Sequence, residues 1–459
     1  MKKRIVLLLL ACMMATGCGK GEQGNPQEPS QMIETSSEEA IYESESDKES
    51  QDNMDEKDNR QEEASSQGEG TVQKLGAKSG DVLAPVTLIT QWQRAAYFAD
   101  RVFDMTRENT FVSPISLEIA LGLAAEGAEG ETAKELYGYL GDEDYGDYVK
   151  EYMDFAESLD QGEDTEIISS SKYTFHYQIA NSIWVREGEK LCSEFIKAAR
   201  EKFSAQAQNV NFVAKAKETA DLINSWCAEK THNLIKEIVT ENSFSPDLET
   251  IIINSLYFES PWMDSWVLYD HEFKNAAGVT KTLEMMRSSG DVYFENDHAT
   301  AFAKEYYNGF EFIGILPKAE GEFSISDLDL ESLMASRTTD YDVLQIAPKL
   351  DFDTTADNIV SILKAQGVNK AFEDDAQFTK LIENMPVHIS DIVQKCKIEM
   401  DEDGTRAAAV TAIMALGNCI EAPDPREIKE VYLDRPFAFM IYDSTNEKIV
   451  FIGKVTDLQ

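Results

Sequence analysis

The chain has 459 residues, and its 84 acidic and 42 basic residues give it a formal net charge of −42 at pH 7. This excess of negative charge repels phosphates and argues against nucleic acid as a partner. At 42% hydrophobic residues, the sequence can still bury a substantial core.

The N-terminus predicts a secretory signal that ends at a lipidated cysteine. Three basic residues precede an apolar run over residues 5–14, which is too short to span a membrane as a helix. The run ends in small residues directly before Cys18, a pattern similar to a bacterial lipoprotein processing site. We therefore expect residues 1–17 to be removed and Cys18 to anchor a secreted protein to the outer side of a membrane. A Gram-positive surface and a periplasm both fit, and ordinary cleavage nearby to give a soluble product is the alternative.

Residues 18–84 are predicted to form an acidic, disordered tether. The segment is dominated by Glu, Asp, Ser, Gln and Gly and has almost no aromatic residues. Such a composition cannot bury enough apolar surface to offset the entropy lost on ordering. Repulsion between like charges should keep the tether extended.

Residues 85–459 are predicted to form one folded domain without a second break in composition. The cysteines left after processing are Cys192, Cys227, Cys396 and Cys419, and their spacing fits neither a disulfide framework nor a zinc site. The five histidines are scattered, and the sequence has no HExxH, GxSxG, Walker or GxGxxG motif. We therefore predict that the protein is not an enzyme and uses neither a metal nor a cofactor.

The domain begins with helices and continues mainly as strands. Apolar residues at helical spacing predict helices over residues 90–107, 116–126, 131–139, 144–158, 193–203 and 217–236. β-prone runs predict strands over residues 110–112, 174–185, 250–258, 438–443 and 449–454, with several more between 315 and 350. This order predicts an α+β fold with large antiparallel sheets.

Five blocks of the sequence resemble the serpin family, in the family's order. They are residues 109–132 (NTFVSPISLEIALGLAAEGAEGET), 223–235 (INSWCAEKTHNLI), 253–262 (INSLYFESPW), 401–411 (DEDGTRAAAVT) and 433–439 with 451–455 (LDRPFAF and FIGKV). The resemblance implies a serpin fold, with three β-sheets, eight or nine helices and an exposed reactive-centre loop. It also implies a monomer.

The resemblance further implies an inhibitor of serine proteases, with cysteine proteases as a second target class. In this family a target protease attacks the loop as a substrate and becomes acylated, and the loop then inserts into the main sheet as a new strand. The alternative is a non-inhibitory serpin that acts as a surface binding lipoprotein. Non-inhibitory members commonly carry bulky or charged residues in the hinge of the loop.

The segment that matches the hinge has the composition that insertion requires. Residues 404–420 contain no proline and one charge, that of Arg406, and the buried face of a central strand tolerates neither. Strand alternation places every second residue from Thr405 on the buried face, so Arg406 would face solvent. The hinge residues are Glu402, Gly404, Thr405, Ala407, Ala408, Ala409 and Thr411. An Ala-rich surface helix capped by Asp401 or Thr405 is the alternative reading of these residues.

The family's usual distance from Gly404 places the scissile bond between Asn418 and Cys419. Asn418 departs from the Arg, Leu or Met that is common there, so an asparaginyl protease or one with a small pocket would fit. The segment before Arg435 is longer than in many relatives, which leaves cleavage at Leu416 or Met414 as an alternative.

Other residues match positions that control how the main sheet opens. Ser113, Ser116 and Asn254 match a polar cluster beneath the sheet, where Gln394 stands in place of the family's usual His. Glutamine can donate and accept, so the network can survive; an unpaired buried group would cost roughly 1–3 kcal/mol. Trp262 matches a tryptophan where the loop enters the sheet, with a large core residue as the alternative reading.

Overall fold

The computed structural model of the chain describes residues 90–141, 145–159, 165–166, 172–173, 175–383, 386–405 and 426–458. The chain divides into two units, Met1–Gly68 and Glu69–Gln459, and every described residue belongs to the second. The predicted signal, the tether and Cys18 therefore lie outside the described residues. So do residues 406–425, which include most of the predicted loop.

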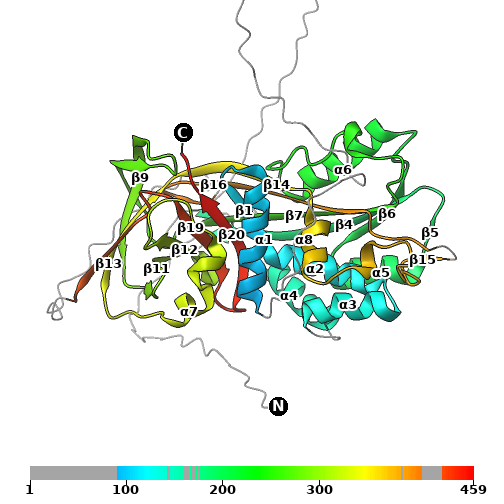
Figure 1. Ribbon diagram of the computed structural model, residues 1–459, viewed down its shortest axis with the longest axis horizontal. Helices are drawn as coiled ribbons and strands as arrows, with labels where there is room; N and C mark the ends of the chain where they lie inside the picture. The colour runs from blue at the N-terminus through cyan, green and yellow to red at the C-terminus, as the bar shows by residue number, and fades with distance from the viewer. Residues whose placement is uncertain are drawn as a thin grey trace, which may run out of the picture. The chain divides into compact units, whose positions relative to one another are not determined.

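A six-stranded sheet, called the main sheet below, runs along the length of the domain (Figure 1). Its strands, in spatial order, are β14 (Leu350–Ala356), β16 (Asp391–Met400), β17 (Gly404–Thr405), β7 (Thr250–Pro261), β4 (His176–Arg186) and β6 (Gln206–Val210). β7 is buried along its whole length. Its run of Ile, Leu and aromatic residues suits a strand that is covered on both faces.

Two further sheets complete the β-structure. The second large sheet contains β1 (Thr110–Val112), β20 (Lys448–Val455), β19 (Phe437–Asp443), β12 (Phe310–Pro317), β11 (Ala299–Glu305) and β10 (Tyr293–Glu295). The third contains β18 (Ile428–Tyr432), β13 (Asp342–Pro348), β9 (Thr280–Gly290) and β8 (Val267–Lys274). Two small pairs are formed by β5 (Lys190–Leu191) with β15 (Ile382–Glu383), and by β2 (Thr165–Glu166) with β3 (Lys172–Tyr173).

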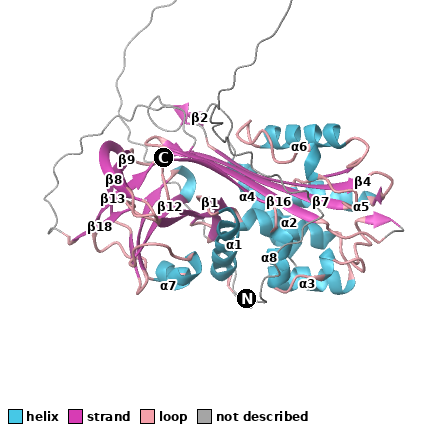
Figure 2. Cartoon of the chain, turned by 45° about the horizontal axis from the view of Figure 1, so that its top comes forward, coloured by secondary structure: helices cyan, strands magenta, loops and turns pink. Residues whose placement is uncertain are grey.

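Eight α-helices pack around these sheets within the described residues. They are α1 (Gln91–Thr106), α2 (Pro114–Glu126), α3 (Gly130–Leu140), α4 (Tyr145–Leu159), α5 (Ser193–Phe203), α6 (Ala216–Lys230), α7 (Leu330–Ala335) and α8 (Ile359–Ala365). α6 lies on one face of the main sheet, while α2 and α3 lie on the other (Figures 1 and 2). Three large sheets with eight helices confirm the predicted α+β fold.

The helix predicted over residues 217–236 is shorter than expected and ends at Lys230. The side chain of Thr231 accepts a hydrogen bond from the backbone N–H of Ile235 at 3.0 Å and donates one to the carbonyl of Cys227 at 2.8 Å. His232 and Asn233 then adopt positive φ angles of 47° and 63°. Two left-handed residues in succession stop an α-helix, although both positions carry side chains. Asn233 thus occupies a backbone conformation that favours glycine.

The described cysteines, Cys192, Cys227 and Cys396, are all free thiols. Burial raises the pKa of Cys227 to about 11, and it also raises that of Cys396. Both therefore remain inert thiols of the core. Within the described residues no three or more His, Cys, Asp and Glu side chains are grouped to hold a metal ion. No helix in this part of the chain has the length and apolarity needed to cross a membrane.

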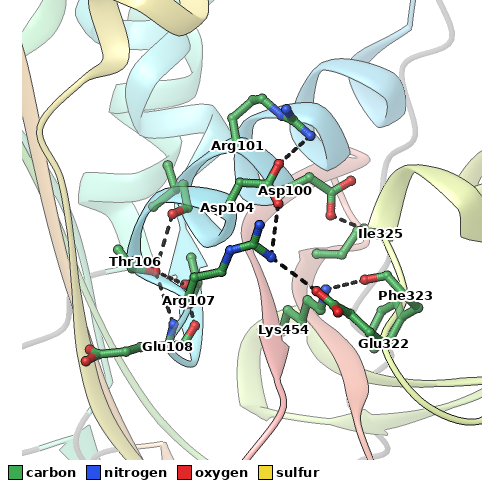
Figure 3. Close-up of polar contacts among 12 residues, drawn as sticks. Asp100, Arg101, Asp104, Thr106, Arg107, Glu108, Glu322, Phe323, Ile325 and Lys454 are labelled. Carbon is green, nitrogen blue, oxygen red and sulfur yellow. Dashed lines mark hydrogen bonds and ion pairs between the residues drawn. The ribbon is translucent and has the colours of Figure 1, made fainter. Parts of the chain in front are cut away.

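A buried polar cluster joins the end of α1 to β20 and to the segment before the 3₁₀ helix Ile325–Leu328 (Figure 3). The carboxylate of Asp100 accepts hydrogen bonds from the backbone N–H of Ile325 at 2.7 Å and from that of Ser326 at 2.9 Å. Lys454 donates to the carbonyl of Phe323, and its ammonium lies over the ring of Phe103. Burial lowers the pKa of Lys454, and the nearby carboxylate of Asp100 opposes that shift.

Replacing Asp100 should therefore destabilise the domain much more than replacing a neighbouring surface carboxylate. Asp100→Ala leaves the buried N–H of Ile325 and the partly buried N–H of Ser326 without their partner, so we expect a loss of about 2–3 kcal/mol in the free energy of unfolding, measured in urea. The control is Asp104→Ala, which removes a partly exposed ion pair with Arg101 at 2.5 Å and should cost less than about 1 kcal/mol. Equal losses for the two variants would contradict this account of the cluster.

Candidate functional site

The main sheet is divided by a seam between β7 and β16. The two strands are parallel and pair directly from Asp391 with Ile251 to Lys395 with Ser255. Farther along, β17 lies between them, where Thr405 pairs with Met400 on one side and with Ser260 on the other. β17 is antiparallel to both neighbours, so a strand that continued beyond Thr405 in the same direction would run down the seam.

A tight turn leads from β16 into β17. The backbone N–H of Asp401 donates to the carbonyl of Gly404 at 2.9 Å. The side chain of Asp401 accepts from the N–H groups of Asp403 at 3.0 Å and Gly404 at 3.2 Å. Asp401 therefore caps a reversal between two strands, and Gly404 and Thr405 are strand residues. A helix capped by Asp401 is therefore not formed at Gly404 and Thr405, while a helix capped by Thr405 would lie in residues outside the described part of the chain.

Thr405 is held in a polar slot at the end of the seam. Only 3% of the residue is exposed, and its hydroxyl lies 2.6 Å from that of Tyr306. Burial raises the pKa of Tyr306, while the hydrogen bond with Thr405 opposes that shift, so the phenol is neutral at physiological pH. The burial of Thr405 is the condition on which the outward orientation of Arg406 depends.

Trp262 forms the wall of this slot. Its ring stacks on Tyr306 with centroids 4.1 Å apart and an angle of 14° between the planes. Its indole N–H donates to the carbonyl of Asp401 at 2.8 Å, and its backbone N–H donates to that of Asp403 at 3.1 Å. Trp262 is thus both a core residue, 4% exposed, and a direct partner of the turn that begins the hinge.

Glu402 ties the same turn to the third sheet. Its carboxylate lies 2.9 Å from the ammonium of Lys349, which lies 2.9 Å from Glu284 of β9. The hydrogen bond from Lys349 lowers the pKa of Glu402. Partial burial works to lower the pKa of Lys349, but the hydrogen bonds with Glu402 and Glu284 raise it overall. The ion pair therefore persists across the neutral pH range.

Three amide side chains form a row across the centre of the main sheet. Asn181 of β4 stands opposite Asn254 of β7, which stands opposite Gln394 of β16. The Nδ2 of Asn254 lies 2.5 Å from Oδ1 of Asn181, and the Nε2 of Gln394 lies 2.5 Å from Oδ1 of Asn254. All three residues are at most 1% exposed. The second of these bonds crosses the seam.

Ser113 and Ser116 connect this amide row to the start of α2. Gln394 accepts from the N–H of Ser113 at 2.8 Å and donates to its carbonyl at 2.9 Å. Asn254 donates to the hydroxyl of Ser116 at 2.6 Å and to its carbonyl at 2.9 Å. Gln394 therefore keeps the network connected without a titratable ring, as a residue that can both donate and accept should.

Three residues at the site were not found from the sequence: Tyr306, Lys349 and Asn181. Each reaches the site from a distant segment through sheet register or packing, and none belongs to a motif. The remaining predicted residues lie outside the described residues. They are Ala407, Ala408, Ala409, Thr411, Asn418 and Cys419, with the alternatives Leu416 and Met414.

The described chain resumes at Arg426, which fixes the far end of this segment. Its guanidinium lies 2.6 Å from Asp342 and donates to the carbonyl of Thr339 at 2.9 Å. β18 follows and pairs in parallel with β13. The segment 406–425 is therefore attached at both ends, to the main sheet through β17 and to the third sheet through β18.

A family model described as "Serpin (serine protease inhibitor)" matches residues 96–458. The chain belongs to the serpin family. An uncharacterized serpin-like protein of Thermococcus kodakarensis is 31% identical over 373 residues, covering 77% of this chain and 83% of the relative. Iripin-3 of Ixodes ricinus is 29% identical over 364 residues, covering 76% and 89%.

Solved serpin structures share the fold. The thermophilic serpin tengpin in its native state is 27% identical, with a TM-score of 0.67, and the match covers 82% of this chain and 96% of tengpin. Thyroxine-binding globulin in complex with thyroxine is 21% identical, with a TM-score of 0.65 and coverage of 80% and 98%, a likeness that concerns the fold alone. Serpins are generally inhibitors of proteases and not catalysts, but some members are non-inhibitory.

The hydrogen bond between Thr405 and Tyr306 should be measurable as a coupling between two conservative substitutions. Thr405→Val and Tyr306→Phe each remove one hydroxyl and leave the other buried, so each single variant should lose stability. The double variant removes both groups, and we expect a coupling of about 1 kcal/mol in a double-mutant cycle of urea unfolding. Losses that add within about 0.3 kcal/mol would show that the two hydroxyls do not interact.

Proposed function

We propose that this serpin inhibits a serine protease, with a cysteine protease as the second possible class, by loop cleavage and insertion. The observation that carries the proposal is the position of β17, which already occupies the first two positions of a new strand between β7 and β16. Continued insertion from Thr405 would exchange the five β7–β16 pairs for two complete sets of antiparallel pairs. The gain in strand pairing would drive the reaction.

The sequence beyond Thr405 supports the same mechanism. With Thr405 buried in β17, strand alternation directs Ala407, Ala409 and Thr411 to the same buried face and Arg406 to solvent. These small side chains fit beside α2 without burying a charge. A non-inhibitory binding role gains no support from such a hinge.

We place the reactive bond between Asn418 and Cys419, with Leu416 and Met414 as the alternative cleavage positions. This assignment rests on the distance from Gly404. An enzyme that accepts Asn in its primary pocket, either an asparaginyl protease or one with a small pocket, is the target class that this bond favours.

We also propose that Cys18 carries a lipid and holds the inhibitor at the outer surface of a membrane, where residues 18–84 would serve as a tether. The proposal rests on the basic residues, the short apolar run and the small residues before Cys18. Mass spectrometry of the mature N-terminus tests it, because an acylated Cys18 and a soluble product cut elsewhere differ in mass.

The decisive experiment incubates the mature protein with a panel of serine and cysteine proteases. We expect one class to form a covalent complex that survives SDS, together with a released C-terminal peptide that begins at Cys419. A peptide that begins elsewhere would move the reactive bond. Cleavage by every protease that attacks the loop, without any stable complex, would overturn the inhibitor assignment in favour of a binding role.

Thr405→Arg should convert the inhibitor into a substrate. Thr405 is already buried in β17, so the arginine would displace β17 from the seam, and insertion would have to bury the charge again at a cost of several kcal/mol. Each 1.4 kcal/mol added to the insertion barrier slows that step tenfold. Hydrolysis of the acyl-enzyme would then be faster than loop insertion. SDS gels would show cleaved serpin and free protease in place of the covalent complex.

The matched control for Thr405→Arg is Thr405→Val, which changes the same buried position without adding a charge. This variant should still form the covalent complex. A Thr405→Arg protein that traps protease as efficiently as the unmodified chain would show that insertion is not the mechanism.

A further inference from the structure

A pair of histidines joins the end of α6 to β4 of the main sheet, one strand away from the seam. His176 begins β4, and His232 lies just after α6. Their ring centroids are 4.4 Å apart. The ring of His232 also stacks on Tyr257 of β7, at 4.8 Å with 11° between the planes. The rings of His176, His232 and Tyr257 therefore form one cluster that joins β4, β7 and the end of α6.

The members of this contact differ in their access to water. His176 is 4% exposed and Tyr257 is 1% exposed, whereas His232 is on the exposed side and covers both. His232 holds a left-handed backbone conformation with φ of 47°, which is uncommon for a residue with a side chain. The turn directs the side chain of His232 toward the sheet, where its ring contacts His176 and Tyr257.

The charged groups around the pair come from the same elements. Glu259 of β7 stands directly opposite His176 in the sheet and accepts a hydrogen bond from the hydroxyl of Tyr257 at 2.5 Å. On the last turn of α6, Glu229 and Lys230 pair with each other at 3.4 Å. The carboxylate of Glu259 is thus placed to balance one imidazolium on the sheet side, while the charge of Glu229 is already shared with Lys230.

The position of α6 links this contact to opening of the main sheet. The helix and the segment after it share one apolar cluster with alternate residues of the sheet, including Ile251 and Ile253 of β7 and Val393 of β16. Ile253 and Val393 are paired across the seam. A strand that enters the seam must separate these two residues, so the α6 cluster has to shift relative to one side of the sheet.

We propose that His176 and His232 form a pH-sensitive latch that docks the end of α6 on the main sheet at neutral pH and releases it in acid. Two neutral imidazoles can lie in contact with their ring centroids 4.4 Å apart. In acid, the first proton is tolerated because Glu259 and the face of Tyr257 stabilise a cation. A second proton places two positive charges on rings whose centroids are 4.4 Å apart. The exposed side chain of His232 can relieve this repulsion by rotating into solvent.

The direction of the effect follows from proton uptake. In the released state both imidazoles can be protonated without repelling each other. In the docked state the second proton must be added against the repulsion from the first. The released state therefore binds more protons in acid, and docking weakens as the pH falls. Easier movement of α6 would then ease opening of the seam, a consequence that rests on the proposed function.

The test is hydrogen exchange with mass spectrometry on the uncleaved protein between pH 7.5 and pH 5, after correction for the intrinsic rate at each pH. We expect protection of residues 216–235 to fall about tenfold at the acidic end, a change equivalent to one pH unit of linkage. Unchanged protection of this region across the range would overturn the proposal. The readout requires no protease, so it is independent of whether the protein is an inhibitor.

Two substitutions of His232 distinguish the effect of its charge from the effect of its aromatic ring. His232→Phe keeps a ring that can stack but cannot be protonated, so protection should become independent of pH at its neutral value. His232→Asn suits the left-handed backbone but lacks the ring, so protection should be low at every pH. A tenfold loss in acid that survives in both variants would exclude the latch.

The controls remove other histidines. His298 is exposed, and His388 lies 3.2 Å from Glu249, just before β7. His298→Gln and His388→Gln should each retain the full loss of protection in α6. Abolition of the response by either control would assign the pH dependence to that histidine and overturn the latch.

Discussion

The proposed inhibition depends on a main sheet in which β7 and β16 pair along only part of their length. β7 and β16 are held together by five parallel residue pairs and by a single amide contact, between Gln394 and Asn254. Parallel pairing is slightly weaker per residue than antiparallel pairing, and an antiparallel strand inserted here would bond on both sides. On the proposed mechanism the inserted arrangement would be the more stable one, and it would grow from β17.

The contacts along the seam have different consequences for opening. At the end where β17 enters, Trp262, Tyr306 and Lys349 hold the turn that feeds this strand, so they favour the start of insertion at Thr405. In the middle, the amide row bridges β7 and β16 and must lose its central bond before a strand can pass. Because Asn254 is bound to Ser116 and to Asn181 as well, it should stay with β7 while Gln394 leaves with β16, still bonded to Ser113.

The sequence was sufficient for the fold because its five serpin-like blocks are local and occur in the family's order. Ser113, Ser116, Asn254 and Trp262 belong to the blocks, and Gln394, outside them, was assigned because it stands where the family usually has a histidine; in the structure all five lie at or beside the seam. Tyr306, Lys349 and Asn181 could not be found in this way, because each is defined by a partner more than 50 residues away in the chain. The end of α6 was misplaced because Thr231, His232 and Asn233 have no glycine to mark the left-handed turn.

The replacement of the family's usual histidine by Gln394 bears on where pH can act. The polar network that bridges the seam consists of serine and amide side chains, which keep the same charge from acid to neutral pH. Two histidine rings are instead in contact, tilted by 39°, where the end of α6 meets the same sheet. A second proton at that contact would loosen the packing of α6 on the sheet and leave the hydrogen bonds across the seam intact. Sheet opening in this chain would then respond to acid through the helix above the sheet, and the central hydrogen bonds would set a barrier that does not vary with pH.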